Sequence, residues 1–121
     1  MGYTALTYAS NEGHLDILKA QDANKDKVDG HGETPLMRAI RKGHVECVKA
    51  LLAAKADVNK ANIYGETPLM CASMMGRVEV VKLLLAAGAK KDKIVTDGST
   101  ALTWATERGQ HEIVQLLQQG A

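Results

Sequence analysis

Histidine, cysteine, serine and acidic side chains are the groups in this sequence that could bind a metal or carry out nucleophilic or acid–base chemistry. The histidines and cysteines are His14, His31, His44, His111, Cys47 and Cys71. They form neither a His-Glu-x-x-His nor a Cys-x-x-Cys pattern, so their spacing does not predict a zinc site. No nucleophile, base and orienting group stand out as a set. We therefore expect no catalytic, cofactor-binding or metal-binding residues, and a protein that is not an enzyme.

Residues 88–91, Gly-Ala-Lys-Lys, have a superficial similarity to a phosphate-binding loop. Such a loop has the spacing Gly-x-x-x-x-Gly-Lys-Ser/Thr and follows a strand, whereas this segment lacks that spacing and follows a predicted helix. Its lysines are interleaved with Asp92. We interpret the segment as a solvated loop and expect no nucleic-acid partner.

The composition is typical of one globular domain. The chain has 121 residues, of which 45% are hydrophobic and 24% charged, and its formal net charge is +1. This charge gives no field that would attract nucleic acid or an anionic membrane. The sequence shows neither an apolar run long enough to cross a membrane nor a signal-peptide pattern. The cysteines do not indicate a disulfide framework, so an intracellular, cytoplasmic location fits best.

The main feature of the sequence is an internal repeat. Residues 32–37 recur letter for letter as residues 65–70, 33 positions later, and residues 98–103 repeat the same frame with changed letters. A fourth copy covers residues 2–7, 30 positions before the second copy. A fixed period of this size is typical of proteins built from stacked structural repeats.

Each repeat carries the signals of two helices. A threonine is placed to cap the first helix, and in the middle copies a proline occupies the first helical position, as in Thr34-Pro35. Leucine and alanine then share one helical stripe, and the recurrent alanine indicates a close approach of neighbouring units. A glycine ends the helix. Amphipathic second helices are expected over residues 45–52, 78–85 and 111–117.

These residues resemble the ankyrin repeat, a pattern of about 33 residues that combines Gly-x-Thr-Pro-Leu, a Gly-His pair and a Val-x-x-Leu-Leu helix. The resemblance covers essentially the whole chain. It implies an all-α solenoid of stacked helix–turn–helix units with β-turn or hairpin connections. We expect one ankyrin-repeat domain over residues 1–121, with a shortened first repeat at 1–28 and further repeats at 29–61, 62–94 and 95–121.

Departures from the family pattern occur in the middle and at the ends. Met37 and Met70 replace the family's histidine after Thr-Pro-Leu, and this removes the side chain that ties neighbouring turns together in the family. The first unit is three residues shorter than the others, and the last helix ends in polar residues. Polar end units are typical of capping repeats. The same features also fit a segment cut from a longer array.

The resemblance implies that a protein partner docks on a concave face made of turn tips and first helices. The turn-tip positions are Tyr3, Gly30, His31, Glu33, Ile63, Tyr64, Glu66, Thr96, Asp97 and Ser99. The outward positions of the first helices, spaced i, i+3, i+4, are Tyr8, Asn11, Glu12, Arg38, Arg41, Lys42, Cys71, Met74, Met75, Trp104, Glu107 and Arg108. The units agree at framework positions and differ at these positions, which we interpret as a recognition surface.

All the aromatic residues of the chain fall on this predicted face. Tyr, Trp and Arg dominate binding hot spots, and Met offers an adaptable apolar surface. We therefore predict an aromatic end, a patch of three cations, a thioether patch and a second aromatic end. Two alternatives stay open: the aromatic and methionine side chains can simply pack over neighbouring helices, and the cations can form a solvated helix face.

The leading hypothesis is a non-enzymatic, monomeric module that binds a protein partner of unknown identity. The second is a structural segment of a longer ankyrin scaffold with no ligand of its own. Self-association through Cys71, Met74 and Met75 is a further possibility.

Asn59 is a candidate for modification. The stretch that ends in Asp57-Val58-Asn59 looks like the context that asparagine hydroxylases modify in ankyrin proteins. The alternative is an asparagine that stabilises its loop. The intact mass of protein from its native cell distinguishes the two.

Overall fold

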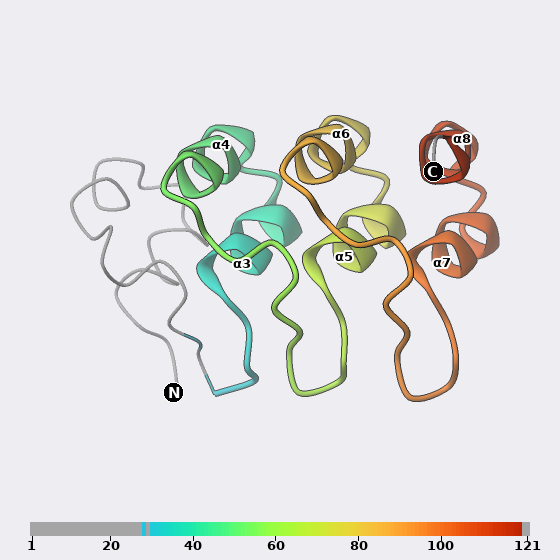
Figure 1. Cartoon of the computed structure of the whole chain (residues 1–121), viewed down its shortest axis with the longest axis horizontal. Helices are drawn as coiled ribbons and strands as arrows, with labels where there is room; N and C mark the ends of the chain where they lie inside the picture. Colours follow the sequence, from blue (N-terminus) through green and yellow to red (C-terminus); the bar gives the residue numbers. More distant parts are fainter. Residues whose placement is uncertain (1–27, 29, 120–121) are drawn as a thin grey trace.

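The computed structural model of the chain describes residue 28 and residues 30–119. Six helices lie in these residues: α3 (Pro35–Lys42), α4 (Val45–Ala53), α5 (Pro68–Met75), α6 (Val78–Ala86), α7 (Ala101–Glu107) and α8 (His111–Gln118). They form three helix pairs, which we call the second (α3, α4), third (α5, α6) and fourth (α7, α8) units. Figure 1 shows α3, α5 and α7 in one row and α4, α6 and α8 in another, with the connecting loops extending beyond the first row. The described part of the chain contains no strand, so the expected all-α solenoid is confirmed.

In each of the three described units a threonine caps the start of the first helix, as predicted. The Thr34 side-chain oxygen accepts a hydrogen bond from the backbone N–H of Met37 at 3.2 Å, and Thr67 and Thr100 do the same for the residue three positions on. Each bond satisfies one of the backbone donors that a helix start leaves without an intrahelical partner. Pro35 and Pro68 follow at the first helical position.

The first helices of the second and third units end at glycines that leave room for the next unit. Gly43 has a φ of 75° and closes α3 in the left-handed conformation. The Arg77 side chain of the third unit lies against this end, where Nε donates to the Ile40 carbonyl and Nη2 to the Arg41 carbonyl, each at 3.2 Å. A Cβ atom at Gly43 would lie 3.2 Å from the Arg77 guanidinium. Glycine here therefore serves both the backbone turn and the contact between units.

The hydrophobic core runs along the stack between the two rows of helices. Leucine and isoleucine side chains such as Leu36, Leu84 and Ile113 are fully buried in it. The recurrent alanines Ala39, Ala72 and Ala105 are also fully buried, as expected where units approach closely; their exposed fraction is 0%. The methionines at the family's histidine position point into this core as well, since Met37 and Met70 are 0% and 1% exposed.

The hydroxyl of Ser73, on α5, is a polar atom inside this core. Ser73 is 0% exposed, and its Oγ has no hydrogen-bond partner among the described residues. The second unit has the fully buried Ile40 at the equivalent position, and the fourth has Thr106, whose hydroxyl donates to the Leu102 carbonyl at 2.8 Å. The third unit therefore buries a hydroxyl group that gives up its hydrogen bonds to water and gains none from the described residues in return.

Replacing Ser73 with alanine is expected to leave the free energy of unfolding unchanged or to raise it by up to about 1 kcal/mol. The change removes an unsatisfied buried hydroxyl and introduces the best helix former. Urea denaturation followed by circular dichroism measures the effect. A loss of more than about 1 kcal/mol would mean that the hydroxyl has a hydrogen-bond partner in solution.

Candidate functional site

The connections that lead into α5 and α7 are tight turns closed by backbone hydrogen bonds. In the third unit the Asn62 N–H donates to the Glu66 carbonyl at 2.9 Å, and the Gly65 N–H donates to the Asn62 carbonyl at 3.0 Å. The fourth unit repeats both bonds between the equivalent residues. Gly65 has a φ of 81°, which favours glycine at this place. The turns thus present the residues at their tips in a fixed backbone geometry.

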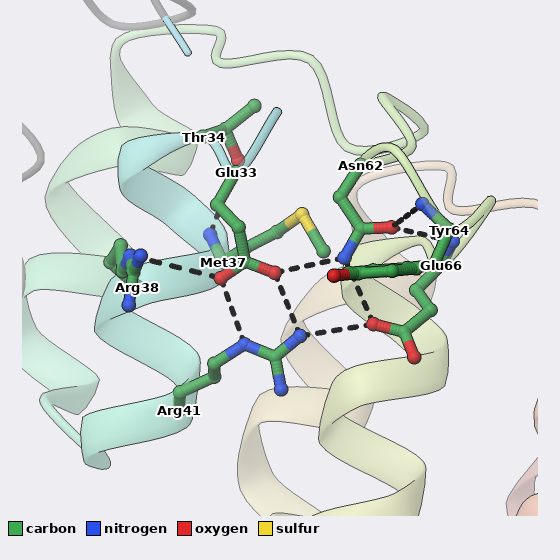
Figure 2. Close-up of polar contacts among 8 residues, drawn as sticks. All are labelled: Glu33, Thr34, Met37, Arg38, Arg41, Asn62, Tyr64 and Glu66. Carbon is green, nitrogen blue, oxygen red and sulfur yellow. Dashed lines mark hydrogen bonds and ion pairs between the residues drawn. The ribbon is translucent and has the colours of Figure 1, made fainter. Parts of the chain in front are cut away.

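An ionic network ties the turns of the second and third units together (Figure 2). Arg41 Nε donates to Glu33 Oε1 at 2.8 Å, and Arg41 Nη2 donates to Glu33 Oε2 at 2.7 Å. The same Nη2 also donates to Glu66 Oε1 at 3.1 Å. One guanidinium therefore holds a carboxylate from each of two consecutive turns, in the two-pronged geometry that gives arginine–carboxylate pairs their strength.

Asn62 completes the network and was not predicted from the sequence. Its Nδ2 donates to Glu33 Oε2 and to Glu66 Oε1, both at 2.9 Å. Its Oδ1 accepts from the backbone N–H groups of Tyr64 at 2.9 Å and Glu66 at 3.0 Å. The amide therefore braces its own turn and joins that turn to the second unit. Neighbouring turns are tied in this way although Met37 and Met70 replace the family's histidine.

The network sets the protonation state of Glu33. Burial by itself raises the pKa of this carboxyl group. The hydrogen bonds from Arg41 and Asn62, with the positive charges of Arg41 and Arg38, outweigh burial and hold the pKa of Glu33 below its ordinary value of 4.5. The side chain is ionised at neutral pH as a result.

The lowered pKa of Glu33 predicts a loss of stability in acid. The Glu33 carboxyl group binds a proton more weakly in the folded state than in the unfolded state. Its contribution to the free energy of unfolding is therefore complete above about pH 4.5 and is lost as the pH falls through the lowered pKa of the folded state. Glu33→Gln should therefore be less stable than the wild type at pH 7, and its stability should fall less steeply below pH 4.5. Denaturant titrations across this range measure both slopes. Parallel slopes for the two proteins would show that Glu33 is not coupled to folding.

Two residues predicted to lie on the recognition surface are buried, so the prediction is wrong for both. Glu33 is 4% exposed because its carboxylate turns inward to Arg41 and Asn62. Cys71 is 0% exposed because its short side chain is covered where α5 packs against α3 and α7. Burial raises the pKa of the Cys71 thiol to about 12, so the group stays protonated at neutral pH. The predicted thioether patch and self-association surface accordingly lose Cys71.

The predicted patch of three cations also requires correction. Arg41 is held by two carboxylates, and Arg38 Nε lies 3.8 Å from Glu33 Oε1. Lys42, at the end of α3, is the exposed member of the three. Two positive and two negative side chains thus balance one another beneath the turns, and the cationic surface is smaller than the sequence indicated.

The other predicted site residues divide by exposure. Half-buried are Glu66, Met74 and Trp104, and the indole of Trp104 packs against the hydrophobic core. Exposed are His31, Lys42, Ile63, Tyr64, Met75, Asp97, Glu107 and Arg108. Tyr3 and Tyr8 lie outside the described residues, so the predicted first aromatic end has no structural description.

Asn59 is part of a loop contact in this structure. Its Oδ1 accepts from the backbone N–H of Lys90 in the next unit at 2.8 Å, and its own N–H donates to Asp57 Oδ1 at 2.9 Å. These bonds support the interpretation of Asn59 as a loop-stabilising residue.

A search for other kinds of site covers the part of the chain that the structure describes. Within residues 30–119, histidine, cysteine and acidic side chains do not gather in any group of three that could hold a metal ion. Among the helices described here, none combines the length and the apolar character needed to cross a membrane.

The fold and its turns define a class of repeat proteins. In this class, short helix pairs with threonine caps and glycine ends are stacked at a fixed period and joined by tight turns. The chain belongs to the ankyrin-repeat family: residues 6–95 and 59–121 match the family described as "Ankyrin repeats (3 copies)". Ankyrin repeats are generally protein-interaction modules, and the family is generally non-enzymatic.

Parts of two longer proteins are similar to this chain. The chain is 44% identical over 45 residues to Inversin of Gallus gallus, a match that covers 37% of this chain and 4% of that protein. It is 43% identical over 54 residues to the Ankyrin repeat and KH domain-containing protein mask-1 of Caenorhabditis elegans, covering 42% of this chain and 2% of that protein. The matches therefore span only a small fraction of the length of these curated relatives.

Proposed function

We propose that this chain is a non-enzymatic module that binds a protein partner on the face formed by its turn tips and first helices. The observation that carries the proposal is the exposure of large apolar side chains at a turn tip, where Ile63 and Tyr64 are 63% and 58% exposed. Side chains of this kind are normally buried, and on a surface they are typical of interaction sites.

Rigidity of the turns gives further support to the proposal. The backbone hydrogen bonds of the third unit's turn, together with the Asn62 side chain, fix this turn before any partner arrives. A surface that is already ordered loses less conformational entropy when it binds, so more of the contact energy appears as affinity.

An affinity experiment with three matched proteins tests this proposal. Three proteins are immobilised: the wild type, a Tyr64→Ala/Trp104→Ala variant and a Lys49→Ala/Lys82→Ala variant. The lysine variant is the control, because its two substitutions lie on the exposed surface of the second helices. We expect at least one protein to bind the wild type and the control alike and to lose about 1–3 kcal/mol of affinity on the Tyr64/Trp104 variant. Equal binding to all three proteins would reject the proposal.

A structural segment of a longer ankyrin array is the second candidate. The small share of the relatives' length that the chain spans, 4% and 2%, favours it. Cooperative unfolding and a monomeric mass in analytical ultracentrifugation would favour an independent module. Association that grows with concentration, with a broad unfolding transition, would favour a segment that neighbouring repeats normally cover.

A further inference from the structure

The turn tip of the third unit differs from the two other described tips in the size and polarity of its side chains. Ile63 and Tyr64 are exposed there. The equivalent pairs are Gly30 and His31 in the second unit and Thr96 and Asp97 in the fourth. Among the described tip pairs this is therefore the one made of two large side chains, and Ile94, two residues before the fourth tip, adds an aliphatic side chain that is 62% exposed.

This tip is fixed more firmly than the sequence indicated. The Ile63 N–H donates to the His31 carbonyl of the second unit's turn at 3.1 Å, which joins the two tips directly. A Cβ atom at Gly32 would lie 3.0 Å from Ile63 N, so the two turns are in close contact. Asn62 Oδ1 holds the Tyr64 N–H at 2.9 Å. The apolar pair is thus displayed on a braced backbone.

The charges beneath this tip balance one another. Arg41 binds the carboxylates of Glu33 and Glu66, and Arg38 lies 3.8 Å from Glu33. Figure 2 shows the Tyr64 side chain beside this network of neutralised charges. An acidic partner would have to compete with two internal carboxylates for the guanidinium of Arg41. An uncharged, apolar partner meets no such competition.

We propose that Ile63 and Tyr64 are the anchor of this module and that its partner offers an uncharged apolar surface, rich in aliphatic or aromatic side chains. The inference rests on the proposed function and adds to it the chemistry of the partner. Binding of this kind depends on burial of apolar area and is therefore insensitive to salt, whereas recognition of an acidic segment weakens as salt screens the charges.

Selection from a phage library of random linear peptides on the full chain tests this inference. The selected peptides are then measured on the wild type, on Ile63→Ser/Tyr64→Ser, on Lys42→Ala and on Trp104→Ala. Both tip residues are more than half exposed, so the tip variant should fold like the wild type, which circular dichroism verifies. We expect peptides rich in Leu, Phe and Trp, with affinity at least about tenfold weaker on the tip variant. Their affinity should change less than about twofold between low and high salt.

The contrary outcomes separate this inference from the proposed function. Acidic peptides that bind less well in high salt and lose affinity on Lys42→Ala would overturn the apolar partner and leave the binding face in place. Peptides that bind the tip variant normally but lose affinity on Trp104→Ala would show that Ile63 and Tyr64 are not the anchor, and would leave the binding face in place. Peptides insensitive to all three variants would contradict both proposals. A failure to enrich any peptide would reject the anchor, since an ordered, exposed apolar pair predicts at least weak selection.

Discussion

Replacing Arg41 with alanine is expected to lower the free energy of unfolding by about 3 kcal/mol. The variant would remove the nearer of the two cations beside the Glu33 carboxylate, whose side chain is only 6% exposed, together with two of its hydrogen bonds. It would also remove the bond to Glu66 that joins two consecutive turns. The expected loss is at the lower end of the range for a broken buried ion pair, because the Arg41 side chain is 27% exposed and water can partly replace it.

Urea denaturation at neutral pH measures this loss, with two controls on the same helix that keep Arg41. Arg38→Ala removes a cation at 3.8 Å from Glu33, and Lys42→Ala removes an exposed one. Each should cost less than about 1 kcal/mol, as is typical of weak or exposed ion pairs. If the Arg41 variant is as stable as the Arg38 variant, the network does not hold the second and third units together.

A double-mutant cycle separates the cost of a stranded carboxylate from the value of the pair. In a Glu33→Gln background, the removal of Arg41 no longer leaves a buried charge at that position. The cost of Arg41→Ala should therefore fall to about 1 kcal/mol, and the difference is the coupling between the two side chains.

Replacing Ala72 with leucine is expected to destabilise the stack by about 3 kcal/mol. Ala72 is 0% exposed, and its helix α5 packs against both α3 and α7. A larger side chain has to push the neighbouring first helices apart or adopt a strained rotamer, and in a closely packed interior either response is costly. The equivalent alanines, Ala39 and Ala105, are buried to the same extent.

Thermal and urea unfolding of this variant should be compared with Ala86→Leu. Ala86 is the exposed last residue of α6, so the same substitution there adds no volume to the core and should change the stability by less than about 0.5 kcal/mol. A small effect at both positions would mean that the recurrent alanine is not required by the spacing of the units.

The sequence allowed the framework of the stack to be predicted because each of its signals is local. Thr34 lies directly before the helix that it caps, Gly43 directly after it, and the repeat period then transfers both assignments to the other units. Hydrophobic periodicity likewise predicted the second helices, since α4 and α6 begin at the expected valines. Such signals depend on a few neighbouring residues and need no knowledge of tertiary contacts.

The exposure of the candidate site residues could not be predicted in the same way, because it depends on side-chain length and on neighbouring units. Arg38, Cys71 and Trp104 occupy one position of the repeat. The short thiol is covered by the adjacent helices, whereas the two longer side chains reach partly into solvent. Glu33 was assigned to the surface because it occupies a turn-tip position of the repeat. Its burial depends on Asn62, which comes 29 residues later and has no equivalent amide in the fourth unit, where Val95 stands.

The two seams of the described stack differ in the chemistry that fixes them. Arg77 and the Asn62 amide join the second unit to the third through polar side-chain bonds. At the seam between the third and fourth units, Val95 takes the place of Asn62, and the neutral amide of Gln110 takes the place of the Arg77 guanidinium against the glycine end of the first helix. The polar side-chain contacts across this seam are exposed ones, from Lys91 Nζ to the Gln119 carbonyl at 2.9 Å and from Lys82 to Glu112 at 3.9 Å. A buried ionic network thus closes the first of these seams, and neutral or exposed contacts close the second. Acid, which protonates Glu33, should therefore loosen the seam between the second and third units before the seam that follows it.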